Sequence, residues 1–215
     1  MLSFLRIYDG VNFISAAIGF LFAIIIALSF HEFAHAFVAF RCGDTTPKIQ
    51  GRVTLNPFKH IDAIGFLCCA LFGFGWAKPV QIQPMNFRNY KKGNGLTSVA
   101  GVIMNLLLAF VGCGFYRGLS LIYVDNIFFD IIMQFFYFTY IINICLAVFN
   151  ILPIYPLDGF KLVENYTKYG NKYVEFMHRY GSFVLLGLIL IFDELLMLLI
   201  AYVRMPIELF WQWIF

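Results

Sequence analysis

The sequence predicts an all-α polytopic membrane protein with five to six transmembrane helices and a short re-entrant or β-hairpin segment near residues 61–84. Of its 215 residues, 61% are hydrophobic and only 13% are charged, whereas soluble domains carry about 25% charged residues. Five apolar stretches are also long enough to cross the hydrocarbon core of a bilayer. The net charge of +3 fits basic loops beside lipid and gives no reason to expect nucleic acid as a partner. We therefore expect one membrane-embedded domain over residues 1–215.

The five apolar stretches cover residues 11–40, 97–116, 127–152, 174–192 and 195–214. Asp193 and Glu194 stand between the last two, where they either interrupt one long helix or separate two helices. A carboxylate at the centre of a bilayer costs roughly 2.5–3.5 kcal/mol. We therefore expect this pair at a membrane surface, where it joins two helices.

A shorter apolar run covers residues 61–76 and contains three glycines. Its length is marginal for a spanning helix and favours a re-entrant hairpin. The residues that follow, Val80-Gln81-Ile82-Gln83, alternate apolar and polar side chains between two prolines. This alternation predicts a short β-strand over residues 79–83.

The basic residues predict the orientation in the membrane. Most lysines and arginines fall in residues 41–60, 77–96 and 158–180, whereas the loop at 117–126 balances one arginine against one aspartate. If the 61–76 run is re-entrant, the three basic segments share one side. By the positive-inside rule that side is cytoplasmic. We expect a multi-pass protein of the cell membrane, such as a bacterial inner membrane.

A cluster of chemistry-bearing residues lies inside the first apolar stretch. His31, Glu32 and His35 form the pattern H-E-x-x-H. Residues four apart share one face of a helix, so the two imidazoles can bind one zinc ion while Glu32 reaches a water molecule on it. The alternative is a pair of core histidines satisfied by other helices, but three polar groups in lipid need a common partner. The pattern therefore predicts a zinc site.

A catalytic zinc site needs a third protein ligand, and Asp158 is the acidic residue best placed to supply it. It follows Pro153 and Pro156, which end the 127–152 helix on the side that the His31 helix also reaches. Irregular backbone of this kind is tolerated at membrane depth where it lines a cavity. Read alone, Asp158-Gly159 could equally be a simple turn. Beside an H-E-x-x-H motif that lacks a third ligand, metal binding is the better interpretation.

The paired motifs resemble those of the site-2 protease family of intramembrane zinc metalloproteases. H-E-x-x-H in a transmembrane helix is followed by N-x-x-P-x-x-P-L-D-G, residues 150–159, and "AGVIMN", residues 100–105, resembles the G-x-x-x-N motif of the family. "LNPFKHIDAIG" and "GWAKPVQIQP" are similar to the compact bacterial branch without a PDZ domain, although Ala63 stands where that branch often has proline. The resemblance spans about residues 20–165.

The resemblance implies one Zn²⁺ per chain, held by His31, His35 and Asp158, with Glu32 as the catalytic acid and base. It implies an endopeptidase that cleaves transmembrane protein substrates in or next to their membrane segments, in regulated intramembrane proteolysis. The catalytic core would cover about residues 11–165, followed by C-terminal helices at about 174–214. The active site would lie towards the cytoplasmic side.

Four further residues are candidates for substrate contact. The resemblance alone places Asn150 near the site, and it places Asn105 there too. As a lone amide in an apolar helix, Asn105 also needs a polar partner, which is either a substrate carbonyl or oxyanion or another helix. Gln81 and Ile82 lie on the predicted strand, whose edge could bind an extended substrate through main-chain hydrogen bonds. An ordinary loop strand is the alternative.

Two other functions would use the same residues. A metal transporter could use the histidines and Asp158 as a transit site, and a non-catalytic membrane protein could bind helices without cleaving them. A hydrolase needs a carboxylate next to the first histidine that stays free of the metal and handles protons, and neither of these two functions does. Glu32 therefore favours the hydrolase. The sequence leaves the substrate and the oligomeric state open.

Overall fold

The computed structural model describes residues 11–72, 75–122, 124–168, 170–191 and 193–215. In chain order its elements are α2 (Val11–Cys42), α3 (Thr46–Ile49), η1 (Pro57–Lys59), α4 (Ala63–Phe72), η2 (Pro84–Asn86), α5 (Tyr90–Ser120), α6 (Ile127–Ile151), α7 (Asp158–Tyr166), α8 (Lys172–Ile191) and α9 (Asp193–Ile214). The predicted all-α class is therefore confirmed for the described residues.

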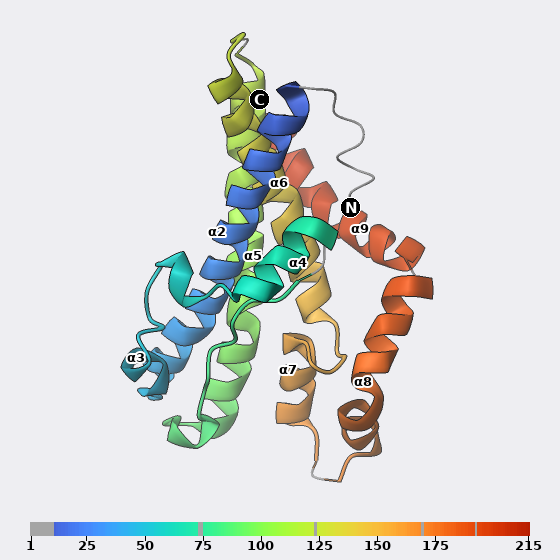
Figure 1. Ribbon diagram of the computed structural model, residues 1–215. Coiled ribbons are helices and arrows are strands. Elements are labelled where there is room, and N and C mark those ends of the chain that lie inside the picture. Colours follow the sequence, from blue (N-terminus) through green and yellow to red (C-terminus); the bar gives the residue numbers. More distant parts are fainter. Residues whose placement is uncertain (1–10, 73–74, 123, 169, 192) are drawn as a thin grey trace.

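Three long helices, α2, α5 and α6, lie side by side and form the centre of the molecule (Figure 1). Alanine and glycine let them approach closely. A Cβ atom on Gly19 of α2 would fall 2.7 Å from the backbone nitrogen of Phe135, and one on Gly112 of α5 would fall 3.0 Å from that of Tyr140. Small residues at such crossings are typical of helices packed in membranes, where van der Waals contact drives association.

The arrangement of the central helices places the candidate site residues towards one end of the molecule. The C-terminal ends of α2 and α6, the start of α5 and all of α7 lie towards the lower end in Figure 1. The basic segments at 41–60, 77–96 and 158–180 belong to these ends and loops. They therefore share one end of the molecule, as the charge pattern predicts.

Four described helices are long and apolar enough to cross a membrane: α2 over Phe13–Cys42, α5, α6 and α8. Helix α9 is not among them and contains Pro206. The predicted count of five to six spans is therefore not confirmed. Helices α8 and α9 run in different directions (Figure 1), which agrees with two helices that meet near the acidic pair. Helix α8 begins at the lower end of the molecule and α9 ends at the upper end, so together they traverse it once (Figure 1).

The segment around α4 leaves and returns at the same place. Ile61 and Ala77 form an isolated antiparallel bridge, and the Lys78 amide donates to the carbonyl of His60 across 2.8 Å. Residues 73–74 of this predicted hairpin lie outside the described residues. The predicted strand over 79–83 is not confirmed, because no described strand lies beside this segment for it to pair with. Instead the segment is held by side chains, as described below.

Candidate metal centre

Helix α2 presents two imidazoles on one face, about two turns before it ends. His31 and His35 are one turn apart, and their Nε2 atoms lie 3.0 Å from each other. Both residues are buried, with 7% and 6% of their surface exposed. Because the two lone-pair-bearing atoms face the same point, the local helix geometry makes a two-histidine site.

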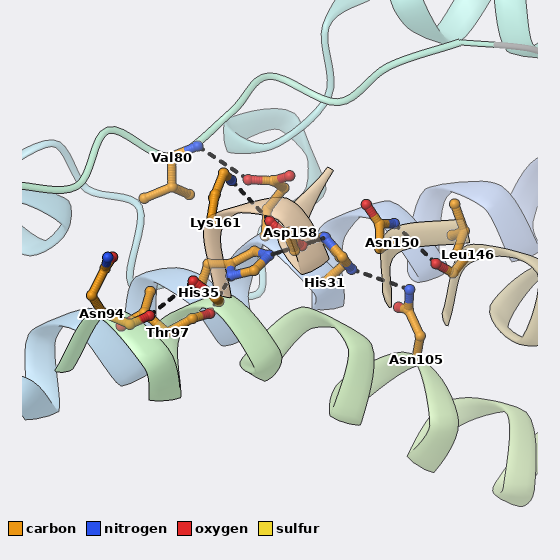
Figure 2. Close-up of polar contacts among 12 residues, drawn as sticks. His31, His35, Val80, Asn94, Thr97, Asn105, Leu146, Asn150, Asp158 and Lys161 are labelled. Carbon is orange, nitrogen blue, oxygen red and sulfur yellow. Dashed lines mark hydrogen bonds and ion pairs between the residues drawn. The ribbon is translucent and has the colours of Figure 1, made fainter. Parts of the chain in front are cut away.

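Helix α7 brings a carboxylate to the same point. The chain leaves α6 in an extended conformation at Leu152, passes the two prolines and begins α7 at Asp158. Oδ2 of Asp158 lies 2.9 Å from Nε2 of His35 and 3.3 Å from Nε2 of His31 (Figure 2). The structure therefore brings together the three residues that the sequence predicts as ligands, although they come from helices separated by more than a hundred residues of chain.

The donor set fits a zinc ion. Zinc in a tetrahedral site binds histidine nitrogen and carboxylate oxygen at about 2.0–2.2 Å, which separates its donor atoms by roughly 3.3 Å. The three donor–donor distances here are 3.0, 2.9 and 3.3 Å. Oδ2 of Asp158 is buried and receives no hydrogen bond from the described residues. Among these residues, His31, His35 and Asp158 form the group that could hold a metal ion.

Lys161, one turn along α7, occupies the other carboxylate oxygen. Its Nζ donates to Oδ1 of Asp158 across 2.8 Å, so that Oδ2 alone faces the imidazoles. Burial disfavours the charge on Asp158, but the adjacent histidines and Lys161 keep the pKa of this carboxyl well below its usual range. The group is therefore an ionised carboxylate that presents one oxygen to the imidazoles. Lys161 was not predicted from the sequence, although its position three residues after Asp158 in a helix could have indicated it.

Helix α5 supports the imidazoles from the side facing away from Asp158. Nδ1 of His35 lies 2.8 Å from the Thr97 carbonyl oxygen, and Nδ1 of His31 lies 3.1 Å from Nδ2 of Asn105. Between these contacts, Gly101 allows the backbone of α5 to touch both rings. A Cβ atom there would fall 2.5 Å from Nε2 of His35 and would also contact Cε1 of His31. The rings are therefore held by the Thr97 carbonyl and the Asn105 amide, and the lack of a side chain at Gly101 leaves room for them against α5.

Glu32 lies beside the donor set and is held by a main-chain group. The Val80 amide donates to Oε2 of Glu32 across 3.1 Å, a hydrogen bond drawn in Figure 2. The extended segment 78–83 therefore passes over the candidate site. This contact could not be predicted from the sequence, because every residue except proline carries a main-chain amide hydrogen.

Segment 78–83 is fastened to the loop after α2. Asp44 is fully buried and accepts the Gln83 amide through Oδ2 across 2.7 Å. Its Oδ1 accepts from Thr46 and from Asn86, which closes the loop on both sides. Burial would raise the pKa of Asp44, but the hydrogen bonds from Gln83, Thr46 and Asn86 outweigh it and lower the pKa. Asp44 is therefore a buried carboxylate that anchors the segment touching Glu32.

The predicted substrate-contact residues lie at different distances from the centre. Asn105 contacts His31, as described, whereas Asn150 donates to the Leu146 carbonyl of its own helix across 3.0 Å (Figure 2). Gln81 is exposed and accepts from the side chain of Gln50 across 2.9 Å. Ile82 lines the cavity beside the candidate site.

That cavity has a volume of about 850 Å³ and reaches His35 and Asp158. Its other walls come from the start of α5, the length of α7, the first turns of α8 and residues 80–84. The cavity therefore connects the donor set with the end of the molecule that carries the basic loops.

Comparison with known proteins matches residues 116–192 to the family described as peptidase family M50. The chain is 38% identical over 149 residues to "Putative zinc metalloprotease YwhC" of Bacillus subtilis, which covers 66% of each protein. It is 32% identical over 152 residues to "Putative zinc metalloprotease Rip2" of Mycolicibacterium smegmatis, covering 65% of this chain and 54% of that one. It is 29% identical over 170 residues to "Putative zinc metalloprotease Rip2" of Mycobacterium tuberculosis, covering 75% of this chain and 60% of that one. No solved structure matches the chain.

Proposed function

This chain belongs to the site-2 protease family, peptidase family M50, and we propose that it is a zinc endopeptidase. Its proposed substrates are membrane proteins, which it cleaves in or next to their transmembrane segments. One observation carries the proposal: the buried triad of His31, His35 and Asp158 lies beside the carboxylate of Glu32. The matched regions span two thirds or less of the relatives' lengths, so the activity itself is proposed from this geometry.

The triad would hold one zinc ion through the two Nε2 atoms and Oδ2, and zinc in such a site acidifies water and polarises a carbonyl group. Lys161 keeps Asp158 in the orientation that presents Oδ2. All three side chains are buried, so few other solvent molecules can compete for their donor atoms outside the cavity that reaches them. These contacts explain why the site can be preorganised before substrate arrives.

Glu32 acts as the general base and then as the general acid. It takes a proton from the attacking water at one carboxylate oxygen, while the Val80 amide holds the other oxygen in place. It returns that proton to the leaving amine nitrogen as the peptide bond breaks. No side-chain nucleophile is needed in this scheme.

A substrate helix must unwind before its peptide bond can react, because each carbonyl oxygen inside a helix already accepts a hydrogen bond. We propose that the 850 Å³ cavity receives the unwound chain and that segment 78–83 binds it through the main chain at Gln81 and Ile82. Asn150 would lie further along the same path. The basic loops at this end support cleavage near the cytoplasmic face of the cell membrane.

The test uses the full chain, purified in detergent, and a panel of single-span substrates, with and without a chelator. Glu32→Gln should retain one zinc ion per chain but cleave about 10²–10⁴-fold more slowly, because it removes the general base alone. Cleavage by that variant at the wild-type rate would contradict the mechanism. Zinc transport into vesicles that survives Glu32→Gln, without cleavage by the wild type, would instead favour a transporter.

A further inference from the structure

Asn105 presents a buried amide to one of the proposed ligands. It belongs to α5 and is fully buried, and its Nδ2 lies 3.1 Å from Nδ1 of His31 (Figure 2). Oδ1 of Asn105 is also buried and has no hydrogen-bond partner among the described residues. The amide therefore makes its one polar contact with the ring nitrogen that faces away from the metal site.

That ring nitrogen must carry a proton when the site holds zinc. A neutral imidazole has one N–H group, and the nitrogen that binds a metal is the unprotonated one. Because Nε2 of His31 faces the other two donor atoms, Nδ1 is the protonated nitrogen. His35 shows the same arrangement, since its Nδ1 lies 2.8 Å from the Thr97 carbonyl oxygen, which can only accept.

We propose that Asn105 is a positioning residue whose Oδ1 accepts the Nδ1 proton of His31 in the zinc-loaded protein. An amide can exchange its oxygen and nitrogen by a half-turn of its last bond. After that turn the oxygen faces the imidazole N–H, and two donors no longer face each other. Nδ2 then occupies the position that Oδ1 held, where it has no partner. One polar atom of the amide is unpaired in either orientation, so the orientation is decided by the proton on Nδ1 of His31.

This inference rests on the proposed zinc site and changes the role that the sequence suggests for Asn105. An oxyanion or substrate contact would use the amide nitrogen as a donor to the reacting carbonyl. The contact with His31 instead uses the amide to fix the ring and its tautomer. Outer partners of metal-binding histidines typically change metal affinity about 10–100-fold. The two roles therefore differ in whether zinc binding depends on Asn105.

Zinc affinity decides between the roles. The full-length protein is purified in detergent, stripped of metal and titrated with Zn²⁺ against a chromophoric chelator. Asn105→Leu, which keeps the volume and removes the acceptor, should weaken zinc binding about 10–100-fold. Asn105→Asp keeps an oxygen but loses the amide nitrogen, and it should bind zinc at least as tightly as the wild type. The visible spectrum of the Co²⁺-loaded protein should change in the Leu variant and stay close to wild type in the Asp variant.

Asn143 provides the matched control. It is an equally buried asparagine on α6, and its amide donates to the Thr139 carbonyl of its own helix and touches no proposed ligand. Asn143→Leu should therefore leave zinc affinity unchanged.

Wild-type zinc affinity in Asn105→Leu would overturn the inference, and lost cleavage in that variant would then support the oxyanion role. If the Leu variant does not fold, Asn105→Ala, which also removes the acceptor, decides: wild-type zinc affinity overturns the inference and weakened binding supports it. A wild-type chain that binds no zinc would contradict the proposed function as well.

Discussion

The Val80 amide hydrogen bonds to Oε2 of Glu32 across 3.1 Å, although 48 residues separate them in the chain. The group that holds the proposed general base thus belongs to the same segment that borders the cavity. An extended substrate lying along this segment would meet the base in a fixed orientation. In the proposed mechanism, binding of the substrate and placement of the base would therefore be coupled through one stretch of main chain.

Val80→Pro removes this amide hydrogen and should lower kcat. A hydrogen bond to a charged group contributes about 1.5–3 kcal/mol, so we expect a loss of roughly tenfold to a hundredfold. Val80→Ala keeps the amide and shortens the side chain, which makes it the control. Steady-state cleavage of one substrate by both variants gives the comparison, and equal kcat values would show that the amide does not hold the base.

Ile82→Pro should impair substrate binding more than Gln81→Pro does. Amides alternate in direction along an extended chain, so the Ile82 amide points to the same side as the Val80 amide, which faces Glu32. Neither the main-chain amide of Gln81 nor that of Ile82 donates a hydrogen bond to another described residue. We expect a raised KM for Ile82→Pro. A KM that is unchanged in both proline variants would rule out main-chain pairing of the substrate here.

Asp44→Asn should lower the stability of the protein at neutral pH and should make that stability less dependent on pH. The folded protein lowers the pKa of Asp44 below its ordinary value of 3.8. The carboxylate therefore contributes stability above that value, and the contribution is lost as the pH falls through the lower pKa of the folded state. We expect a loss of about 1–3 kcal/mol at pH 7, which narrows towards pH 3.

Thermal unfolding of the detergent-solubilised protein between pH 7 and pH 3 measures this effect. Asp62→Asn is the control, because the carboxylate of Asp62 accepts one hydrogen bond from the described residues, that of the Gly65 amide at the start of α4. If wild type and Asp44→Asn differed in stability by the same amount over the whole pH range, the charge of Asp44 would contribute nothing to the stability.

The helices of the core were predictable because each contains a long apolar run, which the bilayer requires whatever its neighbours are. Their ends were less predictable. Helix α5 begins at Tyr90, seven residues before its apolar run, because Asn89 caps it and its first two turns are polar. Helix α7 was missed, since nine amphipathic residues give no apolar run.

The same contrast holds at the candidate site. His31 and His35 could be paired from helical spacing alone, and Asp158 could be matched with them because few acidic residues follow a break in an apolar helix. The contacts from Val80 and Thr97 use main-chain atoms, which any residue supplies, so no side chain in the sequence marked them. The approach of α5 to the imidazoles depends on tertiary packing, although Gly101 was a visible sign of it.

Gly101→Ala should abolish zinc binding while leaving the chain folded. A Cβ atom at this position would lie 2.5 Å from Nε2 of His35 and against the ring of His31, so the imidazoles must move away from Asp158. Overpacking of this kind costs about 1–3 kcal/mol, which is less than the stability of most domains. Zinc content after gel filtration and the melting temperature of the metal-free protein separate the two effects.

Gly187 on α8 offers the matched control for that substitution. A Cβ atom there would meet nothing within 4 Å, and alanine in a helix is more stable than glycine by about 0.5–1 kcal/mol. Gly187→Ala should therefore bind zinc as the wild type does and melt at the same or a slightly higher temperature. If Gly101→Ala also kept a full equivalent of zinc, the donor atoms would have to tolerate a shift of both rings, and the tight convergence of α2, α5 and α7 would not be what defines the site.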